Sequence, residues 1–293
     1  MQERKLVVKK RMNRLLPKDR MKHEWIFTIA LVILLIAFAG CTSLRSEESG
    51  GSASAGRYEI VTLKPFKFYT AHVQGLAFSA GYLFLSAVDR EERTGYLLKI
   101  DPNTFSLIES RKLKIGDMYH AGGISGSNGY LYLPLAEYRP EGRSVVLKID
   151  PHSMKVIESF PVNDHIGAVA SDGKNHIFGM NWDARYIYIW DKKGMLLKKL
   201  KNRRATAYQD IEYRNGKLYC SGIIKWPFMT GVIDIYLFDA NSITLEFKET
   251  RRLPWLGAFH SIAKEGMTIS DGYFYFAPED FPDTRIYRIR RDE

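Results

Sequence analysis

The stretch HVQGLAFSAGYLFLS, residues 72–86, contains the two phrases that decide the fold of this chain. The first phrase returns in altered form as HAGGI from His120, HIGAV from His165, YQDIE from Tyr208 and KEGMT from Lys264. The second phrase, a glycine turn followed by an aromatic-rich run, returns as GYLYLP from Gly129, GKLYCS from Gly216 and GYFYFA from Gly272, whereas the third unit has DGKNHIFGM. A third run closes each unit, as in YLLKIDPNT from Tyr96 and VVLKIDPHS from Val145.

Repeated units of roughly 45 residues, each with three or four short strands, predict an all-β fold of the β-propeller type, because one such sheet cannot bury both of its faces alone. The recurrence gives five blades. The fifth unit ends after its third strand, near Ile289, while YEIVTLK from Tyr58 is an extra strand before the first repeat. We therefore predict a five-bladed β-propeller whose ring is closed by the N-terminal strand pairing with the last blade. The alternative is a stack of unrelated strands.

The N-terminus predicts an export signal. Residues 25–39 form an apolar run of 15 residues, which is short for a membrane span of ~20 residues and suits a signal-peptide core. The run ends in Phe38, Ala39, Gly40 and Cys41, which resembles the cleavage box of bacterial lipoproteins, where the cysteine carries lipid on its thiol. Retention of the run as an uncleaved anchor is the alternative. Met21 offers a second translation start, with a signal peptide of ordinary length.

These signals divide the chain into three parts: a lipoprotein signal peptide at residues 1–40, a lipidated cysteine with a Ser/Gly-rich tether at 41–57, and the propeller at 58–293. The expected location is the cell envelope, on the outer face of a bacterial membrane, either periplasmic or at the cell surface. The membrane is then a partner through the lipid on Cys41.

Charge and cysteine content further limit which classes of binding partner the sequence predicts. The formal net charge is +10, but residues 1–40 contribute +6, which leaves +4 for the rest. A basic leader of this kind faces anionic lipid, so the sequence does not predict a nucleic-acid partner. With Cys41 acylated, Cys220 is alone in an apolar run, where a buried inert thiol is expected.

The repeated first phrase also predicts a site. In a propeller this phrase forms the innermost strand of each blade, and alternate residues of a strand point the same way. Its first position holds His72, His120, His165, Ala207 and either Lys264 or Ala263. When Glu265-Gly266-Met267 is matched to Gln74-Gly75-Leu76, the third position holds Gln74, Gly122, Gly167, Gln209 and Glu265. A second recurring position, seven residues after the start of the second strand, holds Asp89, Glu137, Asp183 and Asp280. These carboxylates are expected near the histidines, and His260 belongs to the same face.

The main functional hypothesis is therefore a binding site at the histidine-bearing mouth of the channel, for a small molecule, a peptide or a sugar. The candidate ligand-binding residues are His72, Gln74, His120, His165, Gln209, Asp210, His260 and Glu265. A second hypothesis is a metal-dependent lyase or hydrolase. In it His72, His120 and His165 hold Zn or Mn, and Glu265 or Asp183 acts as the base. The simplest alternative is that each histidine only binds backbone within its own blade.

Three phrases of this chain resemble repeated phrases of the glutamine cyclotransferases. They are HVQGL from His72, YQDIEYRNGKLY from Tyr208 and KEGMTISDGYFYF from Lys264. The resemblance implies a five-bladed propeller that converts N-terminal glutamine to pyroglutamate. Gln74 matches the family's glutamine in the first phrase, and Gln209 stands where the family has an asparagine. The glutamate that the family places in the second phrase is Gly122 here, and glycine cannot act as acid or base. The resemblance therefore implies the fold more strongly than the activity.

Overall fold

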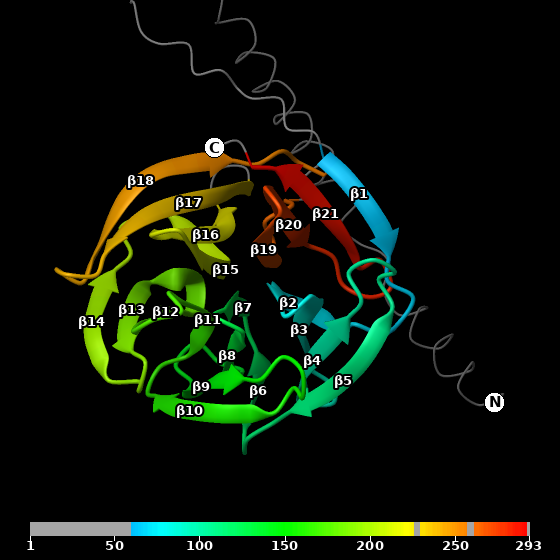
Figure 1. Ribbon diagram of the computed structural model, residues 1–293, viewed down its shortest axis with the longest axis horizontal. Helices are drawn as coiled ribbons and strands as arrows, with labels where there is room; N and C mark the ends of the chain where they lie inside the picture. The colour runs from blue at the N-terminus through cyan, green and yellow to red at the C-terminus, as the bar shows by residue number, and fades with distance from the viewer. Residues whose placement is uncertain (1–59, 226–228, 257–260, 292–293) are drawn as a thin grey trace, which may run out of the picture. The chain divides into compact units, whose positions relative to one another are not determined.

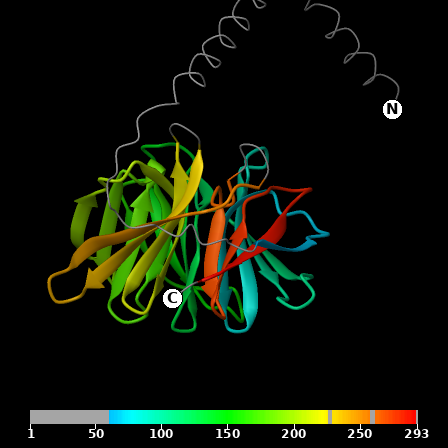
Figure 2. The ribbon, with the colours of Figure 1, turned by 90° about the horizontal axis from the view of Figure 1, so that it is seen from above.

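The computed structural model describes residues 60–225, 229–256 and 261–291. These residues belong to one compact unit, Gly56–Glu293. They form five antiparallel sheets arranged around a common centre (Figure 1). Turned by 90°, the ring shows the connecting loops gathered at its two faces (Figure 2). The prediction of an all-β, five-bladed propeller is confirmed.

The first three blades follow the repeats in chain order. Blade 1 consists of β2 (His72–Ser79), β3 (Tyr82–Asp89), β4 (Thr94–Ile100) and β5 (Leu107–Leu113). Blade 2 consists of β6 (Met118–Ala121), β7 (Ser125–Ser127), β8 (Tyr130–Glu137), β9 (Ser144–Ile149) and β10 (Val156–Val162). Blade 3 consists of β11 (Ile166–Ser171), β12 (His176–Asn181), the short 3-10 helix η1 (Trp182–Ala184), β13 (Tyr186–Asp191) and β14 (Leu196–Lys201).

Blades 4 and 5 complete the ring. Blade 4 consists of β15 (Thr206–Arg214), β16 (Lys217–Ile224), β17 (Thr230–Asp239) and β18 (Thr244–Arg252). Blade 5 takes three strands from the C-terminal repeat and one from the N-terminal side, namely β19 (Gly266–Ser270), β20 (Tyr273–Ala277), β21 (Arg285–Arg290) and β1 (Ile60–Pro65). Ile60 pairs with Ile289 and Thr62 with Tyr287, in antiparallel register. The extra N-terminal strand therefore closes the ring as predicted.

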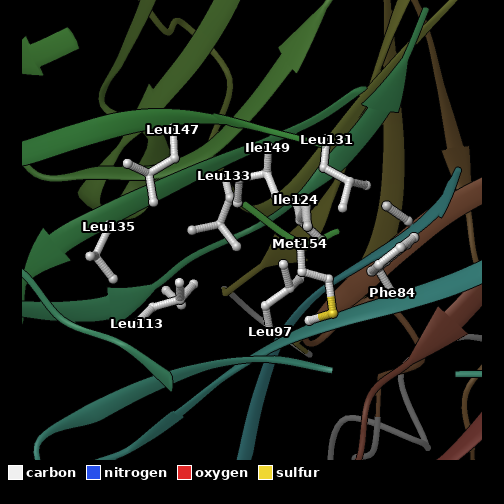
Figure 3. Packing of buried hydrophobic residues seen from close by; sticks show 12 residues of the cluster. Phe84, Leu97, Leu113, Ile124, Leu131, Leu133, Leu135, Leu147, Ile149 and Met154 are labelled. Atoms are coloured by element: carbon white, nitrogen blue, oxygen red, sulfur yellow. The ribbon is translucent and has the colours of Figure 1, made fainter. Parts of the chain in front are cut away.

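The apolar core lies between neighbouring blades. One cluster joins Phe84 and Leu97 of blade 1 to Leu133 and Leu147 of blade 2, all almost completely buried (Figure 3). Each sheet thus covers one of its faces with the sheet before it and the other with the sheet after it, and this mutual burial is what a single blade lacks. Cys220 is fully buried in the core between blades 3 and 4, as expected for an inert thiol. Burial raises the pKa of this thiol well above its usual range.

A buried carboxylate joins the innermost strands at the centre of the ring. Asp210 of β15 is completely buried, and its Oδ2 accepts hydrogen bonds from the amides of Leu76 in β2, at 3.0 Å, and Met267 in β19, at 2.9 Å. Its Oδ1 accepts from the amide of Ile211 at 3.0 Å. One side chain therefore satisfies backbone donors from blades 1, 4 and 5.

The described residues include no helix long and apolar enough to cross a membrane. The apolar run at 25–39, Cys41 and the tether at 41–57 lie outside the residues that the structure describes.

Replacement of Asp210 should destabilise the ring in a graded way. Asp210→Ala leaves two interblade amides without an acceptor, and we expect it to lower the free energy of unfolding by about 3 kcal/mol, since each orphaned buried donor costs ~1–3 kcal/mol. Asp210→Asn keeps one acceptor oxygen and should lose less. Urea unfolding of both variants, beside an exposed Glu141→Ala control in the β8–β9 loop, measures the effect. Equal stability of Asp210→Ala and the control would contradict a central role.

Candidate functional site

A pocket of about 190 Å³ lies where the innermost strands begin and the second strands end. All five blades contribute to its wall. The lining residues are His72, Gln74, Arg90, His120, Tyr138, His165, Gly167, Asn181, Trp182, Asp183, Tyr208, Gln209 and Glu265.

Most of the residues predicted from the repeated phrase are in this wall. The predicted residues that line the pocket are His72, Gln74, His120, His165, Asp183, Gln209 and Glu265. Asp210 is an exception, because its carboxylate points to the backbone at the ring centre, so its assignment to the ligand site is corrected. His260 lies outside the described residues.

β-bulges explain why the third position of the phrase reaches the pocket. The pairing register shifts between Val73 and Gly75, between Ile166 and Ala168, and between Tyr208 and Asp210. In each case the residue in between, Gln74, Gly167 or Gln209, is the unpaired extra residue of the bulge, and a bulge redirects the side chain at that position. Gln209 thus lines the pocket, and its neighbour Tyr208 borders it while its hydroxyl bonds Asp234 and Tyr236 in the core of blade 4.

The two buried histidines form a continuous hydrogen-bonded chain. His120 Nδ1 lies 2.9 Å from His165 Nε2, and His120 Nε2 lies 2.7 Å from Gln74 Oε1. His165 Nδ1 lies 2.8 Å from the carbonyl oxygen of Glu137 and 2.9 Å from that of Arg139. Burial, with the charges of neighbouring His165, His72 and Arg90, lowers the pKa of His120 well below its usual range. Burial also lowers the pKa of His165, although its two carbonyl partners oppose this.

His72 is bound differently. Its Nδ1 lies 2.9 Å from both carboxylate oxygens of Asp280, and it is part-buried. Burial alone would raise the pKa of Asp280, but the hydrogen bond and charge of His72 lower it overall. The predicted link between the histidine and carboxylate positions therefore holds for this pair.

The other three carboxylates of this recurring position, seven residues after the start of each second strand, each have a different partner. Asp183 lines the pocket and its Oδ1 accepts from Lys225 Nζ at 2.8 Å. Glu137 is held by Arg139 and Arg143, and only its backbone carbonyl reaches a histidine. Asp89 accepts from the Tyr69 hydroxyl at 2.7 Å and does not line this pocket.

The three histidines are not arranged as a metal-ligand set. Among the described residues there is no group of three His, Cys, Asp or Glu side chains placed to hold a metal ion. Both ring nitrogens of His120 and of His165 are already in hydrogen bonds, and His72 turns its Nδ1 to Asp280. In this structure His120 and His165 belong to a hydrogen-bonded network and His72 binds Asp280, and a Zn or Mn site at His72, His120 and His165 stays a prediction. The alternative that each histidine stays within its own blade is wrong, since the network crosses blades 1, 2 and 3.

An aromatic wall encloses the two buried imidazoles. The Tyr138 ring lies 4.4 Å from the His120 ring between centroids, and the Trp182 ring lies 4.5 Å from the His165 ring. The guanidinium of Arg90 lies 4.8 Å from the centroid of the Tyr138 ring. No ion pair within the described residues includes Arg90, so the pocket wall carries a positive charge without a carboxylate partner.

Glu265 supplies the acid of the pocket. It is only 5% exposed, and burial raises its pKa to about 8, against the opposing charges of Lys264 and Arg90. Lys264 Nζ is 4.0 Å from Glu265 Oε1, at the limit of an ion pair, and it is half-exposed, so solvent screens its charge. Burial therefore favours the neutral acid form of Glu265.

Sequence reasoning missed Arg90, Tyr138 and Asn181 as pocket residues. Arg90 directly follows Asp89 in blade 1, and Tyr138 directly follows Glu137 in blade 2. Their place next to the recurring carboxylate position could have identified both residues from the sequence. Asn181 ends β12, and its Oδ1 accepts from the amide of Tyr186, so its presence here depends on the turn through η1.

Comparison with known proteins agrees with the geometry at the level of the fold. The family model described as "Family of unknown function (DUF6454)" matches residues 52–251. No curated protein sequence matches the chain. Glutaminyl cyclase from Myxococcus xanthus is a similar solved structure, with a TM-score of 0.53 and 14% identity, covering 80% of this chain and 98% of the cyclase.

Two further solved structures are more distant. Hydrazine synthase from Kuenenia stuttgartiensis has a TM-score of 0.43 and 14% identity over 70% of this chain and 61% of its own. A luciferin-regenerating enzyme has a TM-score of 0.46 and 11% identity, over 75% and 77%. The glutaminyl cyclase structure confirms the resemblance to glutamine cyclotransferases for the fold.

Gly122 gives a physical reason why the cyclotransferase glutamate is absent. A Cβ at Gly122 would lie 2.1 Å from the carbonyl oxygen of Gly167 in the next blade, which is far closer than van der Waals contact. Any side chain there would separate the inner strands of blades 2 and 3. An acidic side chain therefore cannot be accommodated at position 122.

Glu265 predicts a pH dependence of stability. A carboxyl with a folded pKa of about 8 and an unfolded pKa near 4.5 holds its proton more tightly when folded. Its contribution is complete below pH 4.5 and is lost as the pH rises to 8, with a slope of up to ~1.4 kcal/mol per pH unit. We expect the difference in unfolding free energy between wild type and Glu265→Gln to follow this slope from pH 5 to pH 8. Urea unfolding measures it; the exposed Glu141→Gln control should keep the wild-type dependence.

Proposed function

Because the chain belongs to DUF6454, a family of unknown function, we propose a function from the pocket itself: the propeller binds a small polar molecule at its histidine-bearing face. The observation that carries this proposal is the convergence of polar side chains from all five blades on one pocket. They are His72 and Gln74, then His120, His165, Gln209 and Glu265. A fold alone does not specify function, so the proposal rests on these groups.

The size and chemistry of the pocket limit the classes of ligand that can bind. A volume of about 190 Å³ corresponds to roughly six water molecules at liquid density. The pocket therefore suits a small metabolite or one end of a peptide or sugar. Trp182 and Tyr138 offer apolar ring surface, while Gln74, Gln209 and Arg90 offer hydrogen bonds that fix orientation.

Catalysis is the second candidate function, and Glu265 is the observation that favours it. A buried acid with a pKa of about 8 can give or accept a proton near neutral pH. The solved cyclase shares the fold, and Glu265 provides an acid in a pocket where Gly122 provides none. Cyclisation of N-terminal glutamine by a different carboxyl group is the reaction to test first.

We also propose that the propeller is anchored by lipid on Cys41 to the outer face of a bacterial membrane. The support is the apolar run of residues 25–39 ending in the Phe-Ala-Gly-Cys box, followed by a Ser/Gly-rich tether. A pocket on such a domain would meet ligands in the periplasm or outside the cell.

A screen of neutral and charged polar fragments, followed by NMR of the Trp182 indole, tests binding. We expect fragments that shift this signal, and we expect Gln209→Ala to weaken them up to about tenfold, because one lost hydrogen bond is worth ~0.5–1.5 kcal/mol. Asn241→Ala, an exposed amide in the β17–β18 turn, is the matched control. If no fragment shifts pocket signals, the binding function is wrong.

In the test of catalysis, turnover of a peptide that begins with glutamine should fall ~10²–10⁴-fold in Glu265→Gln. Absence of turnover by the wild type would remove that candidate.

Replacement of the proposed lipidated cysteine tests the anchor. Cys41→Ser expressed in a bacterium should leave an uncleaved precursor or release the propeller from the membrane fraction, because the serine cannot carry the thioether-linked lipid. Fractionation and intact mass measure this result. Unchanged membrane retention and unchanged mass would contradict lipidation and favour an uncleaved anchor.

A further inference from the structure

The His120–His165 chain ends in a hydrogen-bond acceptor on both sides. At one end the carbonyl oxygens of Glu137 and Arg139 face His165 Nδ1. At the other end Gln74 Oε1 faces His120 Nε2. The amide of Gln74 is fixed in this orientation, because its Nε2 donates to the carbonyl oxygen of Val73 at 2.9 Å. Turning the amide would place its oxygen against that carbonyl instead.

This arrangement needs one more proton than two neutral imidazoles carry. Three links connect Gln74, His120, His165 and the carbonyls, and each link requires its own N–H. Two neutral imidazoles supply two N–H groups between them, and a protonated pair supplies three or more. In the neutral pair, one link therefore has two acceptors facing each other. A pair with one positive charge satisfies every link.

An aromatic ring packs edge-to-face against each imidazole. The ring centroids lie 4.4 Å apart for His120 and Tyr138, with the planes at 70°, and 4.5 Å apart for His165 and Trp182, with the planes at 83°. A protonated imidazole gains cation–π attraction where its edge meets the face of the neighbouring ring. Burial acts in the opposite direction and lowers the pKa of both histidines, as do the charges of His72 and Arg90 on His120.

Most of the carboxylates around the pair are already bound to a cation. Glu137 is bound by Arg139 and Arg143, and Asp183 by Lys225. Asp280 is bound by His72. Asp164, next to His165, accepts from the neutral Tyr188 hydroxyl and Asn181 amide, so it keeps its negative charge and raises the pKa of His165 against the larger effect of burial. Arg90 adds a positive charge that has no ion-pair partner among the described residues, and burial favours the protonated form of Glu265. An anion that enters the pocket would therefore supply a counter-charge for the protonated pair.

We propose that the pocket takes a ligand bearing a carboxylate, and that the His120–His165 pair takes up one proton as this ligand binds. The inference rests on the proposed binding function of the same pocket and names its ligand class. The carboxylate offsets the charge on the pair, and the charged pair completes the chain from Gln74 to the carbonyls of Glu137 and Arg139. Binding of the anion and binding of the proton thus favour each other.

A matched pair of probes tests this coupling on the propeller domain with its pocket intact. N-acetylglycinate carries a carboxylate that stays ionised above pH ~4, whereas N-acetylglycinamide is its neutral analogue. Calorimetry at pH 7 in two buffers of different ionisation enthalpy counts the protons taken up. We expect N-acetylglycinate to bind with uptake of close to one proton and its affinity to fall up to tenfold per pH unit between pH 6 and pH 7.5. The amide should bind at least tenfold more weakly.

Two variants of Gln74 separate this coupling from a structural role. Gln74→Met removes the terminal acceptor, so two N–H groups satisfy the remaining links, and proton uptake should fall toward zero. Gln74→Glu supplies a resident negative charge, so the pair is protonated before the ligand arrives, and uptake and carboxylate affinity should both fall. A merely packing role for Gln74 would change affinity without changing the proton count. Thermal melts of both variants confirm folding.

The outcomes distinguish this inference from the proposed function. If the amide binds as tightly as the carboxylate, or if the wild type takes up no proton, the inference is wrong while small-molecule binding stands. The same holds if neither probe binds but other polar fragments shift the Trp182 signal. If no fragment of any charge shifts pocket signals, both the inference and the proposed function fail.

Discussion

The structure depends on a contact between side chain and backbone at the centre of the ring, where the Asp210 carboxylate accepts the amides of Leu76 and Met267 from two other blades. Innermost strands of a propeller are neighbours without pairing as a sheet, so their inward amides need other acceptors. Asp210 can approach because Gly123 has no side chain; a Cβ there would lie 2.5 Å from Asp210 Oδ1. Burial raises the pKa of Asp210, and the amides partly offset this. The ring is thus held by a group that the ligand site cannot use.

The same close approach shapes the pocket above it. Gly122 and Gly167 let blades 2 and 3 touch, and the amide of Gly123 donates to the carbonyl of Gly167 at 2.7 Å. This contact brings His120 and His165 within hydrogen-bond distance of each other. A glutamate at Gly122 and a histidine pair at this spacing exclude each other sterically. The chain therefore has glycine where the resemblance to the cyclotransferases implies an acid, and the buried acid of its pocket, Glu265, comes from blade 5.

Repetition made most of the fold predictable from the sequence, because a phrase that recurs five times must occupy five equivalent places. It gave the blades, the closure by β1, and the shared location of His72, His120 and His165. What it could not give was the direction of individual side chains across a bulge. Nothing in the letters Gln-Asp separates the pocket residue Gln209 from the structural residue Asp210, which lie on either side of a register shift. Such choices depend on register, which local sequence specifies weakly.

The histidines show why residue type alone does not determine chemistry. Three imidazoles in one recurring position suggested a metal site, yet two of them bind each other and the third binds a carboxylate. The difference lies in where each ring nitrogen finds its partner, and those partners, the Glu137 and Arg139 carbonyls and the Gln74 amide, come from other segments of the chain. A network that ends in acceptors on both sides has a place for an extra proton, which burial opposes, whereas two neutral imidazoles would satisfy a network that ends in one donor. The proposed proton uptake therefore depends on the orientation of one amide, the Nε2 of which donates to the Val73 carbonyl.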